Sequence, residues 1–175
     1  VGMVGAMGPK TRNLVDNYAV QKHQVGSSIK PLTVYSAALD AGAVTPATTF
    51  DNSPVEPMNN SPWPKNSPNT YTGWTMIGEG VRRSINTIAV QTVQALGVAE
   101  SYAYATEKLG LSLVPEDMAV SPLGMGGLTY GLSTVEMAAA FSAFANSGVY
   151  NSPKMYTEVR DSNGEVVLKN EGETH

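Results

Sequence analysis

The feature that most constrains the fold of this chain is the uneven distribution of proline. Six of the eleven prolines fall between Pro46 and Pro68, in a stretch that is also rich in Asn and Ser. Proline removes a backbone donor and clashes within a helix, so this stretch disfavours a long helix or a central strand. We therefore expect residues 43–73 to form a long irregular excursion rather than a linker, with Trp63 and Tyr71 as apolar anchors on the body.

The composition is that of one globular domain. The 175 residues are 42% apolar and carry a net charge of −4, which does not predict a nucleic-acid partner. The absence of cysteine excludes disulfides and thiol catalysis. We interpret the two histidines, His23 and His175, as surface residues and expect neither a metal ion nor another cofactor. Because no apolar run approaches the ~20 residues that span a bilayer, any membrane anchor would lie outside this chain.

Residues 133–145 give the clearest helix in the sequence. Ser133 and Glu136 have the spacing of a capping box, and an apolar stripe that we expect to be core follows: Met137, Ala140, Phe141 and Phe144. The other elements that we expect are a buried strand at 1–7, helices at 28–41 and 99–109, helical pieces within 75–97 that break near Ser84, a loop at 114–130, and a hairpin of 155–160 with 165–168 around Asn163-Gly164.

The segment Gly26-Ser27-Ser28-Ile29-Lys30-Pro31 combines a possible nucleophile with a possible base. A serine hydroxyl needs a base within hydrogen-bond reach, and residues three apart on a helix share one face. Burial of Lys30 would lower its pKa, so that its neutral amine could accept the proton of Ser27. Alternatively, Ser27 or Ser28 is merely a helix cap and Lys30 a solvated residue of the first turn.

A second pair, Ser84 and Asn86, stands at the break between two helical pieces. The Ser84 hydroxyl could relay a proton between the lysine and a leaving group, and the Asn86 carboxamide could bind a substrate amide through both its donor and its acceptor. The alternative is that Ser84 caps a helix at 85–96. A second Ser-x-Asn, at Ser67 and Asn69, is set aside because it lies in the proline-rich stretch.

The order of these motifs resembles the transpeptidase domain of class A (bifunctional) penicillin-binding proteins. In that family Gly-Ser-x-x-Lys-Pro is matched here by residues 26–31, and Trp-x-Pro-x-Asn by Trp63, Pro64 and Asn66. The Ser-x-Asn motif is matched by Ser84 and Asn86, and the stretch 133–148 is also similar. The resemblance covers essentially the whole chain. It implies an α/β (α+β) fold like that of the penicillin-binding proteins and serine β-lactamases, with a helical subdomain and an incomplete antiparallel sheet.

The resemblance implies specific roles for four residues. Ser27 would be the acylated nucleophile, Lys30 its general base, Ser84 a proton relay and Asn86 a ligand of the substrate amide. The substrates would be peptidoglycan stem peptides ending in D-Ala-D-Ala, with β-lactam antibiotics acylating the same serine. The oxyanion would be held partly by the Ser27 amide. The location would be the outer face of the bacterial cytoplasmic membrane.

The third motif of the family, Lys-Thr-Gly, does not follow the second in this sequence. The only Lys-Thr is Lys10-Thr11, which precedes the nucleophile. We therefore expect residues 1–175 to be a single partial transpeptidase domain, inactive alone, whose C-terminal sheet strands are supplied by the remainder of the domain. Two alternatives remain: a D,D-carboxypeptidase or β-lactamase, in which water resolves the acyl-enzyme, and a non-catalytic β-lactam-sensing or assembly module.

Overall fold

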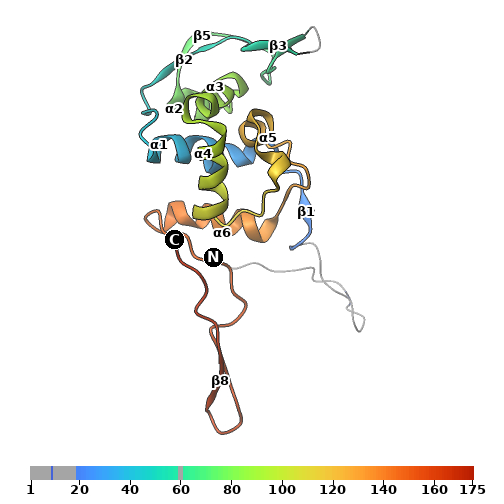
Figure 1. Ribbon diagram of the computed structural model, residues 1–175, viewed down its shortest axis with the longest axis vertical. Helices are drawn as coiled ribbons and strands as arrows, with labels where there is room; N and C mark the ends of the chain where they lie inside the picture. Colours follow the sequence, from blue (N-terminus) through green and yellow to red (C-terminus); the bar gives the residue numbers. More distant parts are fainter. Residues whose placement is uncertain (1–8, 10–18, 59–60) are drawn as a thin grey trace.

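The computed structural model describes residues 9, 19–58 and 61–175. The strand expected at 1–7 lies outside the described residues. Within the described residues six α-helices form a compact body, with paired strands at its two ends and a further short pair, which includes β1, at its side (Figure 1). The helices are α1 (Ser36–Asp40), α2 (Ile77–Arg83), α3 (Asn86–Leu96), α4 (Val98–Ala103), α5 (Val120–Met125) and α6 (Thr134–Ala145).

The helix expected at 28–41 is confirmed, but it has three kinds of turn. A 3₁₀ turn at Gly26–Ile29 and a π-helical turn at Pro31–Tyr35 lead into α1. This segment lies between two groups of buried side chains. Ile29 and Leu32 pack in one group with α6, and Val34 and its neighbours pack in the other with α3. Burial on both sides fixes this helix at the centre of the body.

Helix α3 packs against four of the other helices, namely α1, α2, α4 and α5. The predicted helix at 99–109 is confirmed as α4 continued by a π-helical turn at Tyr104–Lys108. The loop expected at 114–130 is wrong in part, because it contains a 3₁₀ turn at Pro115–Asp117 and the short helix α5. None of the helices in the described ranges combines the length and hydrophobicity that crossing a bilayer requires.

The prediction of an irregular excursion at 43–73 is wrong in part, because short antiparallel pairs organise it. β2 (Thr49–Asn52) pairs with β5 (Gly73–Met76), and β3 (Glu56–Met58) pairs with β4 (Ser61–Trp63). Pro57 and Pro62 are partners in the second pair. In a two-stranded pair both strands are edge strands. Each therefore has positions whose N–H needs no partner strand, and a proline is tolerated there.

The anchors of this stretch also differ from those predicted. Trp63 and Tyr71 are only half-buried, whereas the polar residues Asn52 and Asn66 are buried, with 2% and 9% of their surface exposed. Phe50 packs against the group of buried side chains that includes Val34. The stretch is therefore attached to the helices mainly by buried amides, whose hydrogen bonds are described below.

Helix α6 begins with the predicted capping box, in which the Ser133 hydroxyl accepts from Glu136 N–H and the Glu136 carboxylate accepts from Ser133 N–H. The predicted core stripe is wrong for its two phenylalanines. Phe141 is 37% exposed and Phe144 is 54% exposed. The small side chains of Ala139, Ala140 and Ala143 face the body instead, because they allow the helix to approach closely.

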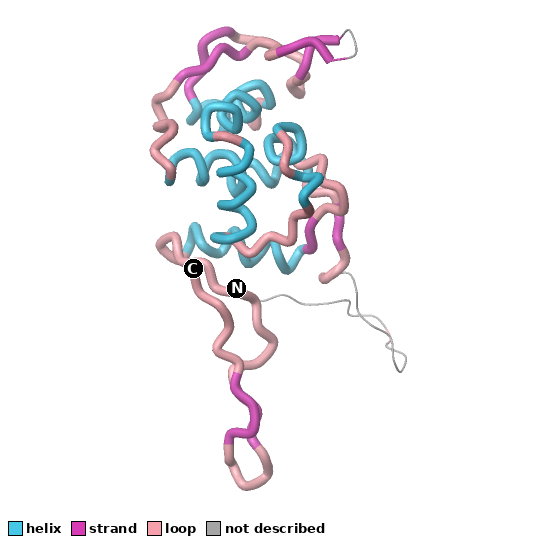
Figure 2. Tube along the Cα trace, in the orientation of Figure 1, coloured by secondary structure: helices cyan, strands magenta, loops and turns pink. Residues whose placement is uncertain are grey.

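Two further strand pairs complete the described fold. β1 (Lys22–His23) pairs with β6 (Leu132–Ser133), next to the Gly26–Ile29 turn. β7 (Glu158–Arg160) and β8 (Val166–Lys169) form the hairpin predicted from Asn163-Gly164, although β7 is shorter than the predicted run at 155–160 and β8 begins and ends one residue later than the run at 165–168. This hairpin projects away from the helices as an exposed arm (Figure 2).

Candidate active site

Ser27 lies in the first turn of the central helix segment, three residues before Lys30. The 3₁₀ turn places Lys30 N–H on the carbonyl of Ser27, and side chains three apart in such a turn lie one above the other. Pro31 follows and has no N–H to offer that carbonyl. Ser27 is exposed, whereas Lys30 is only 2% exposed. The turn therefore combines a surface hydroxyl with a buried amine.

The two serines of this segment differ in their hydrogen bonds. The Ser28 hydroxyl donates to the Val25 carbonyl at 2.6 Å. The Ser27 hydroxyl has no hydrogen-bond partner among the residues that the structure describes, and it makes no direct bond to the other three predicted site residues. Its backbone amide belongs to the first turn of the helix, where N–H groups have no intrahelical partner. Of the two hydroxyls, that of Ser28 is therefore engaged, whereas that of Ser27 is exposed and unbonded within the described residues.

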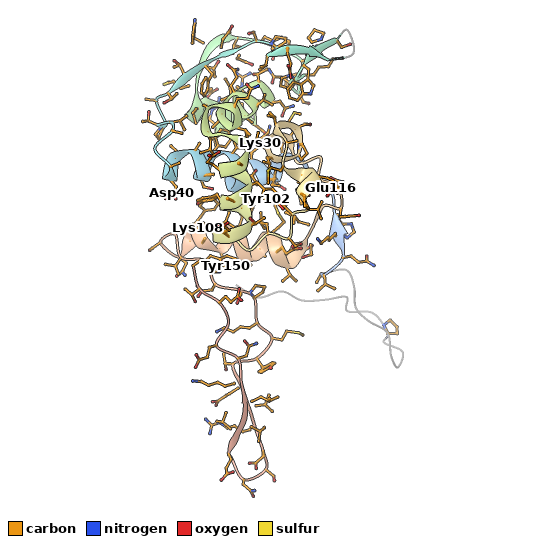
Figure 3. All side chains as sticks on the ribbon, viewed as in Figure 1. Lys30, Asp40, Tyr102, Lys108, Glu116 and Tyr150 are labelled. Carbon is orange, nitrogen blue, oxygen red and sulfur yellow. The ribbon has the colours of Figure 1, made fainter. Side chains whose placement is uncertain are left out.

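Lys30 lies among the helices of the body (Figure 3), and its ammonium group joins the two predicted motifs. Its Nζ donates to the Ser84 carbonyl at 2.8 Å, to Ser84 Oγ at 3.2 Å and to Asn86 Oδ1 at 2.5 Å. These are three acceptors for three N–H donors, so the charged form of Lys30 is fully satisfied. The structure thus brings Lys30, Ser84 and Asn86 together from segments more than 50 residues apart.

Burial lowers the pKa of Lys30 from its ordinary value of 10.5 to about 8, because it removes the ammonium from water. The three acceptors are uncharged, so no carboxylate offsets this cost. When Lys30 loses a proton, the Ser84 carbonyl and Asn86 Oδ1 still accept its two remaining N–H groups. Ser84 Oγ can instead donate to the free lone pair. The site can therefore hold either form of the amine near neutral pH.

Ser84 has an unusual backbone conformation. It ends α2 with a φ of 54° and a ψ of 43°, in the left-handed region that favours glycine. The prediction that it caps a helix at 85–96 is wrong. The residue before α3 is Ile85, and Ser84 is instead the C-cap residue of α2. Such a conformation costs about 1–3 kcal/mol and persists where the surrounding structure imposes it. Here it turns both the carbonyl and the hydroxyl of Ser84 toward Lys30.

The orientation of Asn86 is set by the proline-rich stretch. Asn86 Nδ2 donates to the Lys65 carbonyl at 2.7 Å, which leaves Oδ1 for Lys30 and one N–H of the amide for another partner. Asn66 Oδ1 accepts from Asn86 N–H at 3.0 Å and from Thr87 N–H at 3.2 Å. The site predicted from the sequence did not include this loop. The only signal for it was the Trp-x-Pro-x-Asn motif.

Gly126 supports the backbone that precedes Ser27. It has a φ of 79°, and a Cβ on it would lie 2.0 Å from the carbonyl oxygen of Gly26. Nearby, Gln24 Nε2 donates to the Leu128 carbonyl at 2.6 Å. The loop after α5 therefore contacts the backbone of Gly26 and the side chain of Gln24, and the sequence pattern did not predict these contacts.

An open groove of about 480 Å³ lies between the β1–β6 pair and α6. Val25, Ser28, Met137 and Phe141 are among its lining residues, and none of the four predicted site residues is. The groove therefore runs alongside the turn at Gly26–Ile29, but Ser27 itself does not line it.

The fold and this arrangement of motifs define a class of protein, and comparison with known families agrees. Residues 3–174 match the family model of the penicillin-binding protein transpeptidase domain. The chain is 42% identical over 153 residues to penicillin-binding protein 1A of Clostridium botulinum strain Hall. This chain belongs to the penicillin-binding protein transpeptidase family, and its α/β fold is that of the family.

Solved structures share this fold. Penicillin-binding protein 1A from Haemophilus influenzae superposes with a TM-score of 0.71 at 27% identity, covering 91% of this chain and 24% of that one. The D,D-transpeptidase domain of a peptidoglycan glycosyltransferase from Eggerthella lenta gives a TM-score of 0.70 at 23% identity, covering 92% of this chain and 46% of that one. The match to the Clostridium botulinum protein covers 82% of this chain but 18% of that protein. The chain thus spans about a fifth of the length of the relatives that it matches.

Proposed function

We propose that this chain carries the nucleophile, base and proton relay of a peptidoglycan D,D-transpeptidase. The observation that carries the proposal is the bonding of the buried Lys30 amine to Ser84 and Asn86, three residues after an exposed and unbonded Ser27 hydroxyl. This geometry occurs in a chain of the transpeptidase family.

The first half-reaction forms an acyl-enzyme. The neutral Lys30 amine takes the proton of Ser27, whose oxygen attacks the carbonyl carbon of the penultimate D-Ala of a stem peptide. The oxyanion is stabilised partly by the Ser27 N–H at the start of the helix. The bond between the two D-Ala residues then breaks, and the departing nitrogen receives a proton passed from Lys30 through Ser84 Oγ. Terminal D-Ala leaves as the free amino acid.

The second half-reaction transfers the acyl group. The amine of a neighbouring stem peptide attacks the ester, loses a proton through the same relay and releases Ser27, so that a new peptide bond links two strands. The free N–H of Asn86 is suited to the amide carbonyl of the donor peptide, because its other N–H and its oxygen are already engaged. A β-lactam acylates Ser27 by the same attack, with its ring amide as the broken bond.

We also propose that the site is completed by further parts of a longer protein that lies outside the cytoplasm. A strand bearing Lys-Thr-Gly would supply another oxyanion donor and a pocket for the substrate carboxylate. The exposed Phe141 and Phe144 on α6 offer an apolar face on which such strands can pack. By itself the chain would then bind β-lactams poorly and cross-link nothing. Any attachment to the membrane would lie in those further parts.

The test uses the full-length protein that contains this sequence. A stem peptide ending in D-Ala-D-Ala and an amine acceptor are supplied, and mass spectrometry measures cross-linked product, hydrolysed donor and free D-Ala. The proposal expects cross-linked product and an equal amount of D-Ala, both lost in Ser27→Ala. Hydrolysed donor alone would indicate a carboxypeptidase, and penicillin labelling without either product would indicate a sensing module. Either result would contradict the proposal.

A further inference from the structure

The buried side chain of Asn66 uses all of its hydrogen-bonding capacity. Its oxygen accepts the N–H groups of Asn86 and Thr87, at 3.0 and 3.2 Å, and its nitrogen donates to Asn52 Oδ1 at 2.7 Å and to the Thr70 carbonyl at 2.9 Å. Two acceptor sites and two donors are all that a carboxamide has. Asn66 therefore acts as a cap for α3 that comes from another part of the chain.

The polar cluster around Asn66 continues beneath the start of α3. Asn52 Oδ1 also accepts from Thr87 Oγ1 at 2.5 Å, and Asn52 Nδ2 donates to Thr72 Oγ1 at 2.8 Å. Asn52 and Thr87 are almost completely buried. A buried network in which every member is satisfied holds one arrangement rigidly, because each broken bond leaves a polar group without a partner. The first residue of α3 is thus held in one position.

Asn66 holds the backbone N–H of Asn86, and the residue before it, Lys65, holds the Asn86 side chain. The Lys65 carbonyl accepts from Asn86 Nδ2, so the amide cannot turn over without losing that bond. Asn86 Oδ1 consequently faces Lys30 Nζ at 2.5 Å. We propose that Asn66 is a positioning residue of this site: together with the Lys65 carbonyl it fixes Asn86 against Lys30 and so sets the protonation and orientation of the amine next to Ser27.

This inference rests on the proposed function, since it assumes that Lys30 is the base. Losing Asn86 Oδ1 as an acceptor would disfavour the ammonium form further, and a negative charge near the start of α3 would favour it. No charged side chain is bonded to Lys30 Nζ within the described residues. The elements packed around it carry charged residues that are all exposed or half-buried: Asp40, Lys65, Glu79, Arg82, Arg83, Glu100, Glu107 and Lys108. Of these, Glu79 is paired with Arg82 at 2.6 Å.

The experiment measures the rate of acylation by a fluorescent penicillin against pH in the full-length protein that contains this sequence. Asn66→Ala should lower the maximal rate about tenfold or more, because the amine is no longer aligned, and should move the acid limb of the profile to lower pH. Asn66→Asp retains an acceptor for both amides of α3, loses the two N–H donors to Asn52 and Thr70, and adds a charge, so it should move the limb by about half a unit or more to higher pH. Asn69→Ala is the matched control, because Asn69 is exposed in the same loop and its side chain only accepts from Tyr71.

Opposite shifts of the limb in the two Asn66 variants, with Asn69→Ala unchanged, support the inference, because a loss of stability alone would scale the rate without moving the limb. If Asn66→Ala does not fold, the upward shift in Asn66→Asp decides. If the acid limb of the pH profile of Asn66→Asp lies at the same pH as that of the unaltered protein, the inference is wrong, and the proposed function is unaffected. Absence of acylation in the unaltered protein would instead overturn the proposed function itself.

Discussion

The buried amine of Lys30 should give acylation a pH dependence that can be calculated. With a pKa of about 8, Lys30 is neutral in about 1% of molecules at pH 6, about a tenth at pH 7 and half at pH 8. If the neutral amine is the base, the acylation rate should rise about ninefold from pH 6 to 7 and about fivefold from pH 7 to 8, and then level off. A lysine with its ordinary pKa of 10.5 would give a tenfold rise per unit up to about pH 10.

The assay is stopped-flow acylation of the full-length protein that contains this sequence, with a fluorescent penicillin under pseudo-first-order conditions between pH 5.5 and 10. The uncatalysed hydrolysis of the penicillin is subtracted at each pH, and Ser27→Ala reports any labelling elsewhere. A rate that is flat between pH 6 and 8 would refute Lys30 as the titrating base. A rise that continues to pH 10 would refute the claim that burial tunes its pKa.

Three further predictions concern the scaffold. Gly126→Ala should slow acylation strongly and destabilise the protein by several kcal/mol, because its Cβ would meet the Gly26 carbonyl at 2.0 Å. Gly127→Ala is the control: its Cβ would have nothing within 4 Å, so it should change neither the acylation rate nor thermal unfolding. Ser84→Gly should stabilise by about 1 kcal/mol in thermal unfolding because it relieves a left-handed serine, yet acylate more slowly because the relay hydroxyl is gone. Ile88→Ala should cost about 2–4 kcal/mol in denaturant unfolding because Ile88 is fully buried, whereas Phe144→Ala in this chain should change stability by about 0.5 kcal/mol or less; equal costs would contradict the observed burial.

The sequence was most informative where the deciding signal is local. The capping box of Ser133 and Glu136 and the Asn163-Gly164 turn depend on neighbours within a few residues, and both are present in the structure. The Ser27–Lys30 spacing also predicted a shared face, which the 3₁₀ turn provides. The family resemblance added what no single motif could, namely that the two serine motifs belong to one site.

The features that were missed depend on contacts between distant parts of the chain. α6 is apolar on two faces, so its pattern alone could not show that its alanines, rather than Phe141 and Phe144, face the body. The anchoring of the proline-rich stretch by Asn52 and Asn66 requires hydrogen bonds to residues of α3 that are 20 to 35 positions away in the sequence. The left-handed Ser84 is likewise imposed by its surroundings and not by its own propensity.

The most direct test of the central claim is to identify the residue that penicillin acylates. The full-length protein that contains this sequence is treated with penicillin, its intact mass is measured, and the adduct is mapped in proteolytic peptides. The account predicts one adduct, on Ser27, that is absent in Ser27→Ala and retained in Ser28→Ala. An unmodified protein, or an adduct on Ser28 or any other residue, would contradict it.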